Sequence, residues 1–116
     1  MTTLLKQEAK RWLADVPEEY LFWCSDGRTI RNMKELAEIL SVMTDETFSY
    51  HANPQKNDFS TWVRDIICDE KLADDLLQAF SRTLAAIIVT EREASLSDSL
   101  KPLKKPSRKR PYKSVT

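Results

Sequence analysis

Apolar residues recur along most of the chain at the three- and four-residue spacing of amphipathic helices. Residues 3–16 carry the first such stripe. We expect Pro17 to end that helix, because the residue before a proline is pushed out of the α conformation. Asn32, with Glu35 three residues later, resembles a capping box at the start of a second helix. Thr44 is expected to cap a short third helix that runs to about His51.

Two further stripes predict helices in the second half of the chain. After a polar loop over residues 52–57, Asn57 or Asp58 is expected to cap a helix whose apolar positions are Phe59, Trp62, Val63, Ile66 and Ile67. From about residue 70 to 94, a four-residue repeat predicts one long helix, built on Leu72, Leu76, Phe80, Leu84 and Ile88. A strict four-residue step drifts around the axis by about 40° per step, so the far end is expected to present a different face. Residues 95–99 form a polar exit.

Residues 20–31 do not follow the helical pattern. Residues 20–24 are mostly aromatic, and Asp26-Gly27 follows at once. An aromatic run before Asp-Gly predicts a β-hairpin, and Gly27, the only glycine of the chain, suits a turn position with positive φ. The predicted fold is therefore mostly α, a compact bundle of four to five helices with a short β-hairpin.

The charges of the chain are sorted along its length. The 18 acidic residues balance the 18 basic ones, but residues 1–100 hold all the acids and 11 bases, giving 11 − 18 = −7, whereas residues 101–116 carry +7. Three prolines interrupt this basic segment, and almost nothing in it is apolar, so ordering it would not repay the entropy lost. We predict a helical domain over residues 1–96 and a disordered basic tail over residues 97–116.

The basic tail suits nucleic-acid phosphates, because each neutralised phosphate releases condensed counterions. The predicted phosphate-binding residues are Lys101, Lys104, Lys105, Arg108, Lys109, Arg110 and Lys113. Nothing in the segment encodes base recognition, so DNA and RNA remain equal alternatives. The leading hypothesis is a non-enzymatic, nucleic-acid-associated accessory protein that binds phosphates through this arm.

A second hypothesis is a protein–protein adaptor or regulatory module that docks through the helical body. The long C-terminal helix would then present Ile87, Ile88 and Val89 to a protein partner or to a second copy of the chain. A tail that only aids solubility, or that folds back onto the acidic body, is the alternative without a binding role. An enzyme with His51 at its centre is the third hypothesis.

Few residues have the spacing of a catalytic or metal site. His51, the only histidine, stands seven residues before Asp58, and such a pair could act in acid–base chemistry or bind a metal. A structural zinc site needs four ligands, and the spacing of Cys24 and Cys68 does not supply them. We therefore expect a structural hydrogen bond from His51 to Asp58 or to a helix N-terminus, no cofactor, and no enzymatic activity.

Other polar and aromatic residues are expected to serve the fold. The acidic pairs Asp69-Glu70 and Asp74-Asp75 read as solvated faces. Trp12 and Trp62 lie on apolar stripes and are expected in the core, whereas Trp23 is left open. The two cysteines are expected to be reduced and partly buried. No signal peptide and no apolar stretch of about 18 residues is present, so we expect a cytoplasmic protein without a membrane segment.

The middle of the chain resembles an uncharacterised family of small archaeal and bacterial domains. The resemblance covers roughly residues 18–80 and leaves out the first helix and the basic tail. Its motifs are the aromatic run with Asp26-Gly27, Met33-x-x-Leu36 with Glu35, Phe48-x-x-His51, Asn57-Asp58-Phe59-x-x-Trp62, and Asp69 with Leu72-Ala73. The resemblance implies a compact domain and no particular activity.

Overall fold

The computed structural model describes residues 2–101, with side chains from residue 6 onward. Within that range the chain forms six α-helices: α1 (Thr2–Leu13), α2 (Met33–Val42), α3 (Asp45–His51), α4 (Asp58–Trp62), α5 (Glu70–Leu77) and α6 (Arg82–Leu100). The shorter elements are the 3-10 turn η1 (Glu18–Tyr20), the π-helix η2 (Val63–Ile67) and the strands β1 (Phe22–Trp23), β2 (Thr29–Ile30), β3 (Ala52–Asn53) and β4 (Lys56–Asn57). The mostly helical prediction is confirmed, with six α-helices in place of four to five.

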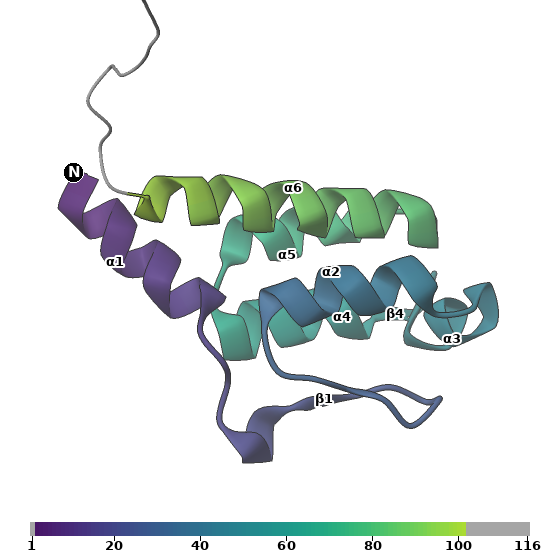
Figure 1. The fold of residues 1–116 in the computed structure, drawn as a ribbon. Coiled ribbons are helices and arrows are strands. Elements are labelled where there is room, and N and C mark those ends of the chain that lie inside the picture. The colour runs from purple at the N-terminus through teal and green to yellow at the C-terminus, as the bar shows by residue number, and fades with distance from the viewer. Residues whose placement is uncertain (1, 102–116) are drawn as a thin grey trace, which may run out of the picture.

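Helix α6 is the element against which much of the bundle packs. It contacts α1, α2 and α5, and Figure 1 shows α2 running beneath it while α1 crosses one end. Small residues of α6 are buried in this contact, among them Ala85 and Val89. They meet a layer of larger apolar side chains from the neighbouring elements, chiefly Ile30, Met33, Leu36, Leu40, Phe59, Val63, Leu72 and Leu76. No helix in the described range is both long enough and apolar enough to cross a membrane.

The predicted helix caps are present in the structure. The side chain of Asn32 accepts a hydrogen bond from the Glu35 amide at 2.8 Å, and that of Thr44 accepts one from the Thr47 amide at 3.0 Å. The capping box is incomplete, because the Glu35 carboxylate accepts from the Arg31 amide, one residue before the cap. Both caps nevertheless satisfy amides that would have no partner inside the helix.

The predicted β-hairpin forms between β1 and β2. The strands are antiparallel, with Phe22 opposite Ile30 and Trp23 opposite Thr29. Phe22 and Ile30 point into the core, whereas Trp23 is 67% exposed, as the alternation of a strand requires. Gly27 sits in the turn with φ of 96°, which glycine adopts without the steric cost that a β-carbon brings.

The single long helix expected over residues 70–94 is wrong. The chain breaks after Leu77, and Ser81 caps a new helix by accepting a hydrogen bond from the Leu84 amide at 3.1 Å. The break lets α6 bury Ala85, Val89 and Leu96 in place of the drifting four-residue stripe, and it leaves Phe80 outside the core. Helix α6 then continues to Leu100 through the expected polar exit. The division of the chain at residue 96 stays a prediction.

Two boundaries also differ from the sequence pattern. Helix α1 ends at Leu13 and not at residue 16, because the Val16 amide instead donates to the Arg31 carbonyl at 2.8 Å. The expected loop over residues 52–57 is a second antiparallel hairpin, β3–β4. In its turn, the Asn53 side chain accepts a hydrogen bond from the Gln55 amide at 3.0 Å. This hairpin carries the chain from α3 into α4.

Candidate functional site

One predicted phosphate-binding residue lies in the described part of the chain. Lys101 follows the end of α6, and its ammonium lies 3.1 Å from the Asp98 carboxylate, with both side chains about two-thirds exposed. An exposed pair of this kind is worth little and exchanges readily for a phosphate. The other predicted residues lie outside the described range: Lys104, Lys105, Arg108, Lys109, Arg110 and Lys113.

Most basic residues of the helical body are already paired with acids. Of the 11 Lys and Arg residues before Lys101, eight have a carboxylate within 4 Å. These eight are Arg28, Arg31, Lys34, Lys56, Arg64, Lys71, Arg82 and Arg92. Their local charges are therefore balanced, and the excess of acid remains over much of the body.

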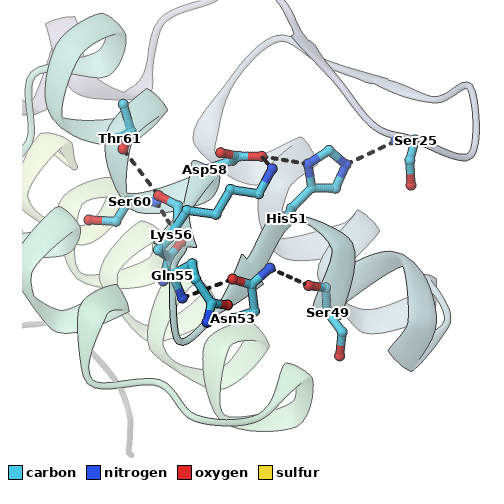
Figure 2. A network of polar contacts seen from close by, with 10 residues as sticks. Ser25, Ser49, His51, Asn53, Gln55, Lys56, Asp58, Ser60 and Thr61 are labelled. Carbon is cyan, nitrogen blue, oxygen red and sulfur yellow. Dashed lines mark hydrogen bonds and ion pairs between the residues drawn. The ribbon is translucent and has the colours of Figure 1, made fainter.

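His51 joins two segments that are distant in sequence (Figure 2). It is the last residue of α3 and is almost fully buried. Its Nε2 accepts a hydrogen bond from the Ser25 amide at 2.9 Å, and its Nδ1 lies 3.0 Å from Asp58 Oδ2. Because Nε2 accepts, Nδ1 carries the proton and donates to Asp58. The hydrogen bond expected between His51 and Asp58 is confirmed.

Asp58 has a different role from the expected helix cap. Asn57 caps α4, since its side chain accepts the hydrogen bond from the Ser60 amide at 3.0 Å. The Asp58 carboxylate is thereby free to receive His51 and the Lys56 ammonium, which lies 3.0 Å away. Burial acts to raise the Asp58 pKa, but the hydrogen bonds from His51 and Lys56 outweigh it and hold the pKa below its ordinary value.

This network holds the fold rather than presenting a reactive group. Both ring nitrogens of His51 have partners, so in this conformation Nε2 has no free lone pair with which to take a proton from a substrate. Phe22, Tyr50 and Phe59 pack around the ring. Within residues 6–101, no three His, Cys, Asp or Glu side chains are placed to share a metal ion. The network therefore ties the β1–β2 turn to α3 and to the start of α4.

A hollow of the described surface lies elsewhere, between the β3–β4 hairpin and the α5–α6 connection. This groove has a volume of about 900 Å³. Its apolar lining includes Phe80, which is 89% exposed, and Leu77, which is 55% exposed. Asn53 and Arg82 contribute to its polar lining. The sequence pattern missed the groove because it placed Phe80 inside a continuous helix. The Ser81 cap was the signal that could have revealed it.

The docking face expected on α6 is largely absent. Val89 is fully buried and Ile88 is half-buried, which leaves Ile87 as the exposed member of the three.

The two acidic pairs differ in their exposure to solvent. Asp74 and Asp75 are solvated as expected, but Asp69 is completely buried. The sequence pattern does not indicate the burial of Asp69, because its partner, Arg92, lies on another helix.

The tryptophans and cysteines differ in how deeply they are buried. Trp62 belongs to the core and donates from its indole nitrogen to the Tyr20 carbonyl at 2.8 Å, whereas Trp12 is half-buried at its edge. Both cysteines are free thiols. Cys24 is buried, and this burial, with the charge of Asp26, raises the pKa of its thiol to about 11. Cys68 is exposed, contrary to expectation.

Arg92 and Asp69 form a strongly buried ion pair, which connects two helices of the bundle. Two candidates for binding follow from the features described so far, namely the basic segment that begins at Lys101 and the groove beside Phe80. The resemblance to a family of small domains stays a prediction, since no family model, curated protein or solved structure matches the chain.

Proposed function

We propose that this is a non-enzymatic accessory protein that binds nucleic-acid phosphates through its C-terminal basic segment. The observation that carries the proposal is the division of charge, −7 in residues 1–100 against +7 in residues 101–116. The seven cations of the segment fall within 13 residues, 101–113, with no acid among them. Such a density of positive charge fits a polyphosphate backbone.

The charges of the helical body also favour phosphate binding by the basic segment over binding by the body. Its net negative charge repels a phosphate backbone, and eight of its cations are held by neighbouring carboxylates. Nucleic-acid affinity is therefore assigned to the basic segment, which starts where α6 ends. Phosphate contacts position a protein without reading bases, so the proposed binding extends to DNA and RNA alike.

The test uses the full-length chain, with the six basic residues from 104 to 113 changed to glutamine. Affinity for a labelled duplex of mixed sequence is measured by fluorescence anisotropy over a series of KCl concentrations. The unaltered chain should show a linear fall of log K with log salt, by about 0.9 for each phosphate engaged. The neutralised chain should lose most of this dependence while its thermal unfolding stays unchanged. Equal binding by the two chains would overturn the proposal.

A second function, self-association of the helical body, is favoured by the groove beside Phe80. The same surface offers an almost fully exposed phenyl ring and a groove next to it. A two-fold axis would let each Phe80 enter the groove of the other copy, because an isologous contact pairs a surface with itself. Exposed apolar area of this kind commonly marks an interface.

Sedimentation velocity over a range of protein concentrations tests this second function. We expect a concentration-dependent dimer that Phe80→Ser abolishes. Ile87→Ser removes another exposed apolar side chain, one that does not line the groove, and should leave the dimer intact. A protein that stays monomeric at every concentration would exclude this function.

A further inference from the structure

Three basic residues of the described body form no ion pair. Among the side chains from residue 6 to 101, Lys6, Lys10 and Arg11 are the Lys and Arg residues with no carboxylate within 4 Å. All three lie on α1. Lys10 and Arg11 are exposed and Lys6 is half-buried. The sequence pattern places these three residues away from the apolar stripe of the first helix. The structure adds that none of them has a carboxylate partner.

The three cations share the outer face of α1. Successive residues turn by about 100° around a helix, so Lys6 and Arg11 bound an arc of about 140° that also contains Gln7 and Lys10. No acid falls within that arc. The opposite face carries Ala9 and the half-buried Trp12, which pack against the core.

The one acid of α1, Glu8, lies off this arc, about 60° beyond Arg11 by the same rotation. Asp15 follows the end of the helix, and its carboxylate accepts a hydrogen bond from the Asn32 side chain at 2.7 Å. The outward arc is therefore a cationic strip without an acid, on a body whose net charge is negative.

Helix α1, which carries the cationic strip, packs beside the helix that leads into the basic segment. Helices α1 and α6 contact each other, and the start of α1 and the C-terminal end of α6 lie at the same end of the molecule (Figure 1). The stacking of the Arg92 guanidinium over the Trp12 ring, at 5.3 Å from its centroid, fixes how the two helices cross. The basic segment thus begins, directly after α6, at the end of the molecule where α1 starts.

We propose that Lys6, Lys10 and Arg11 form a phosphate-binding strip on the folded body, which adds to the phosphate contacts proposed for the basic segment. This inference rests on the function proposed above and adds a defined site on the body. On the described body before Lys101, a nucleic-acid backbone would meet Lys and Arg side chains without a carboxylate within 4 Å on α1, whereas the other cations there are paired with acids. The strip thereby sets the side on which the body lies against the backbone, and Lys6 and Lys10, one helical turn apart, offer two neighbouring charges.

The test compares two full-length variants of matched charge. The first is Lys6→Gln/Lys10→Gln/Arg11→Gln. The control is Arg31→Gln/Lys34→Gln/Lys71→Gln, which removes one arginine and two lysines outside α1, each already paired with an acid four residues later in the chain. Glutamine keeps helix propensity close to that of lysine and arginine. Circular dichroism melts confirm that both variants fold.

Binding to a labelled duplex of mixed sequence is measured by anisotropy over a KCl series. The slope of log K against log salt should fall in magnitude by up to about 2.7 in the α1 variant, since each lost phosphate contact removes about 0.9. The control should keep the slope of the unaltered chain. The double variant Lys10→Gln/Arg11→Gln, which spares the half-buried Lys6, should lose about two-thirds as much.

The outcomes separate this inference from the proposed function. If the unaltered chain binds and the α1 variant keeps its full slope, the role of α1 is wrong while phosphate binding by the basic segment stands. If the control loses as much as the α1 variant, the effect is one of net charge, and the α1 site is again wrong. If the unaltered chain shows no salt-dependent binding, both proposals fail.

Discussion

Arg92 holds the buried carboxylate of Asp69 with two parallel hydrogen bonds. Nε lies 2.8 Å from Oδ2 and Nη2 lies 2.9 Å from Oδ1. Asp69 is fully buried and also caps α5, by accepting a hydrogen bond from the Leu72 amide at 3.2 Å. The guanidinium in turn faces the ring of Trp12. A single carboxylate thus connects α1, the start of α5 and α6.

Removing Arg92 should destabilise the fold strongly. Arg92→Met leaves the Asp69 carboxylate buried without its partner, and breaking a buried pair in this way costs about 3–5 kcal/mol. Urea unfolding followed by circular dichroism gives the change in free energy of unfolding. Arg31→Met, which breaks an exposed pair with Glu35, should cost less than about 1 kcal/mol. A similar small loss for Arg92→Met would show that the buried pair contributes little.

His51→Ala should loosen the β1–β2 turn without affecting phosphate binding. The substitution removes the acceptor of the Ser25 amide and the donor to Asp58, each worth about 0.5–1.5 kcal/mol, besides the packing of the ring. Hydrogen exchange at the Ser25 amide should therefore quicken more than exchange within α6. Unchanged protection at Ser25 would mean that the turn is held by its own strands. Loss of duplex binding in this variant would place His51 in a functional site after all.

Asp58 should contribute stability that disappears in acid. Its folded pKa lies below the ordinary value, so the contribution is fully present above the unfolded pKa of about 3.9 and is lost as the pH falls through the folded pKa. Lys56→Met removes one of the two groups that lower this pKa, and the Asp58 pKa should then rise. An NMR titration of the side-chain carboxyl carbon measures it in both chains. An equal or lower pKa in the variant would contradict the assigned cause.

The features that could be read from the sequence are those whose partners lie nearby in the chain. Asn32 and Thr44 were identified as caps because each bonds an amide three residues on. The His51–Asp58 pair was foreseen because only a short hairpin separates the two residues. Gly27 marked the β1–β2 turn for the same local reason.

The features that were missed depend on contacts between distant segments. Asp69 looks like a surface acid until Arg92, 23 residues later, is placed beside it. Ser25 gives no signal that its amide is the donor to a histidine 26 residues away. The four-residue apolar repeat runs unbroken through Phe80 and conceals the restart of the helix at Ser81, for which the capping serine is the one local signal and the packing of α6 on α2 is the distant cause. The cationic strip on α1 also depends on distant contacts, because Lys6, Lys10 and Arg11 stand out only once the other basic residues of the body are seen to lie beside acids.

Cys68→Gly should stabilise the protein. Cys68 ends η2 with φ of 75°, and it is the one non-glycine residue of the described chain with a positive φ. A β-carbon in this left-handed conformation costs about 1–2 kcal/mol, whereas glycine adopts it freely at helix ends. Glycine also gives the unfolded chain more conformational freedom, which lowers the free energy of unfolding by about 0.5–1 kcal/mol and so offsets part of the relief of strain. Because the side chain is exposed, little packing is lost, and the net gain is expected at about 0.5–1 kcal/mol.

Cys68→Ala separates relief of backbone strain from removal of the thiol. Alanine keeps the β-carbon, so this control should show no gain in urea unfolding, while Cys68→Asn should fall between alanine and glycine because asparagine tolerates the left-handed region. The order glycine, asparagine, alanine follows from the backbone alone. If alanine stabilised as much as glycine, the thiol and not the positive φ would be the source of the cost. The break between η2 and α5 would then be relaxed in the native chain, set only by the cap at Asp69 and its bond to Arg92.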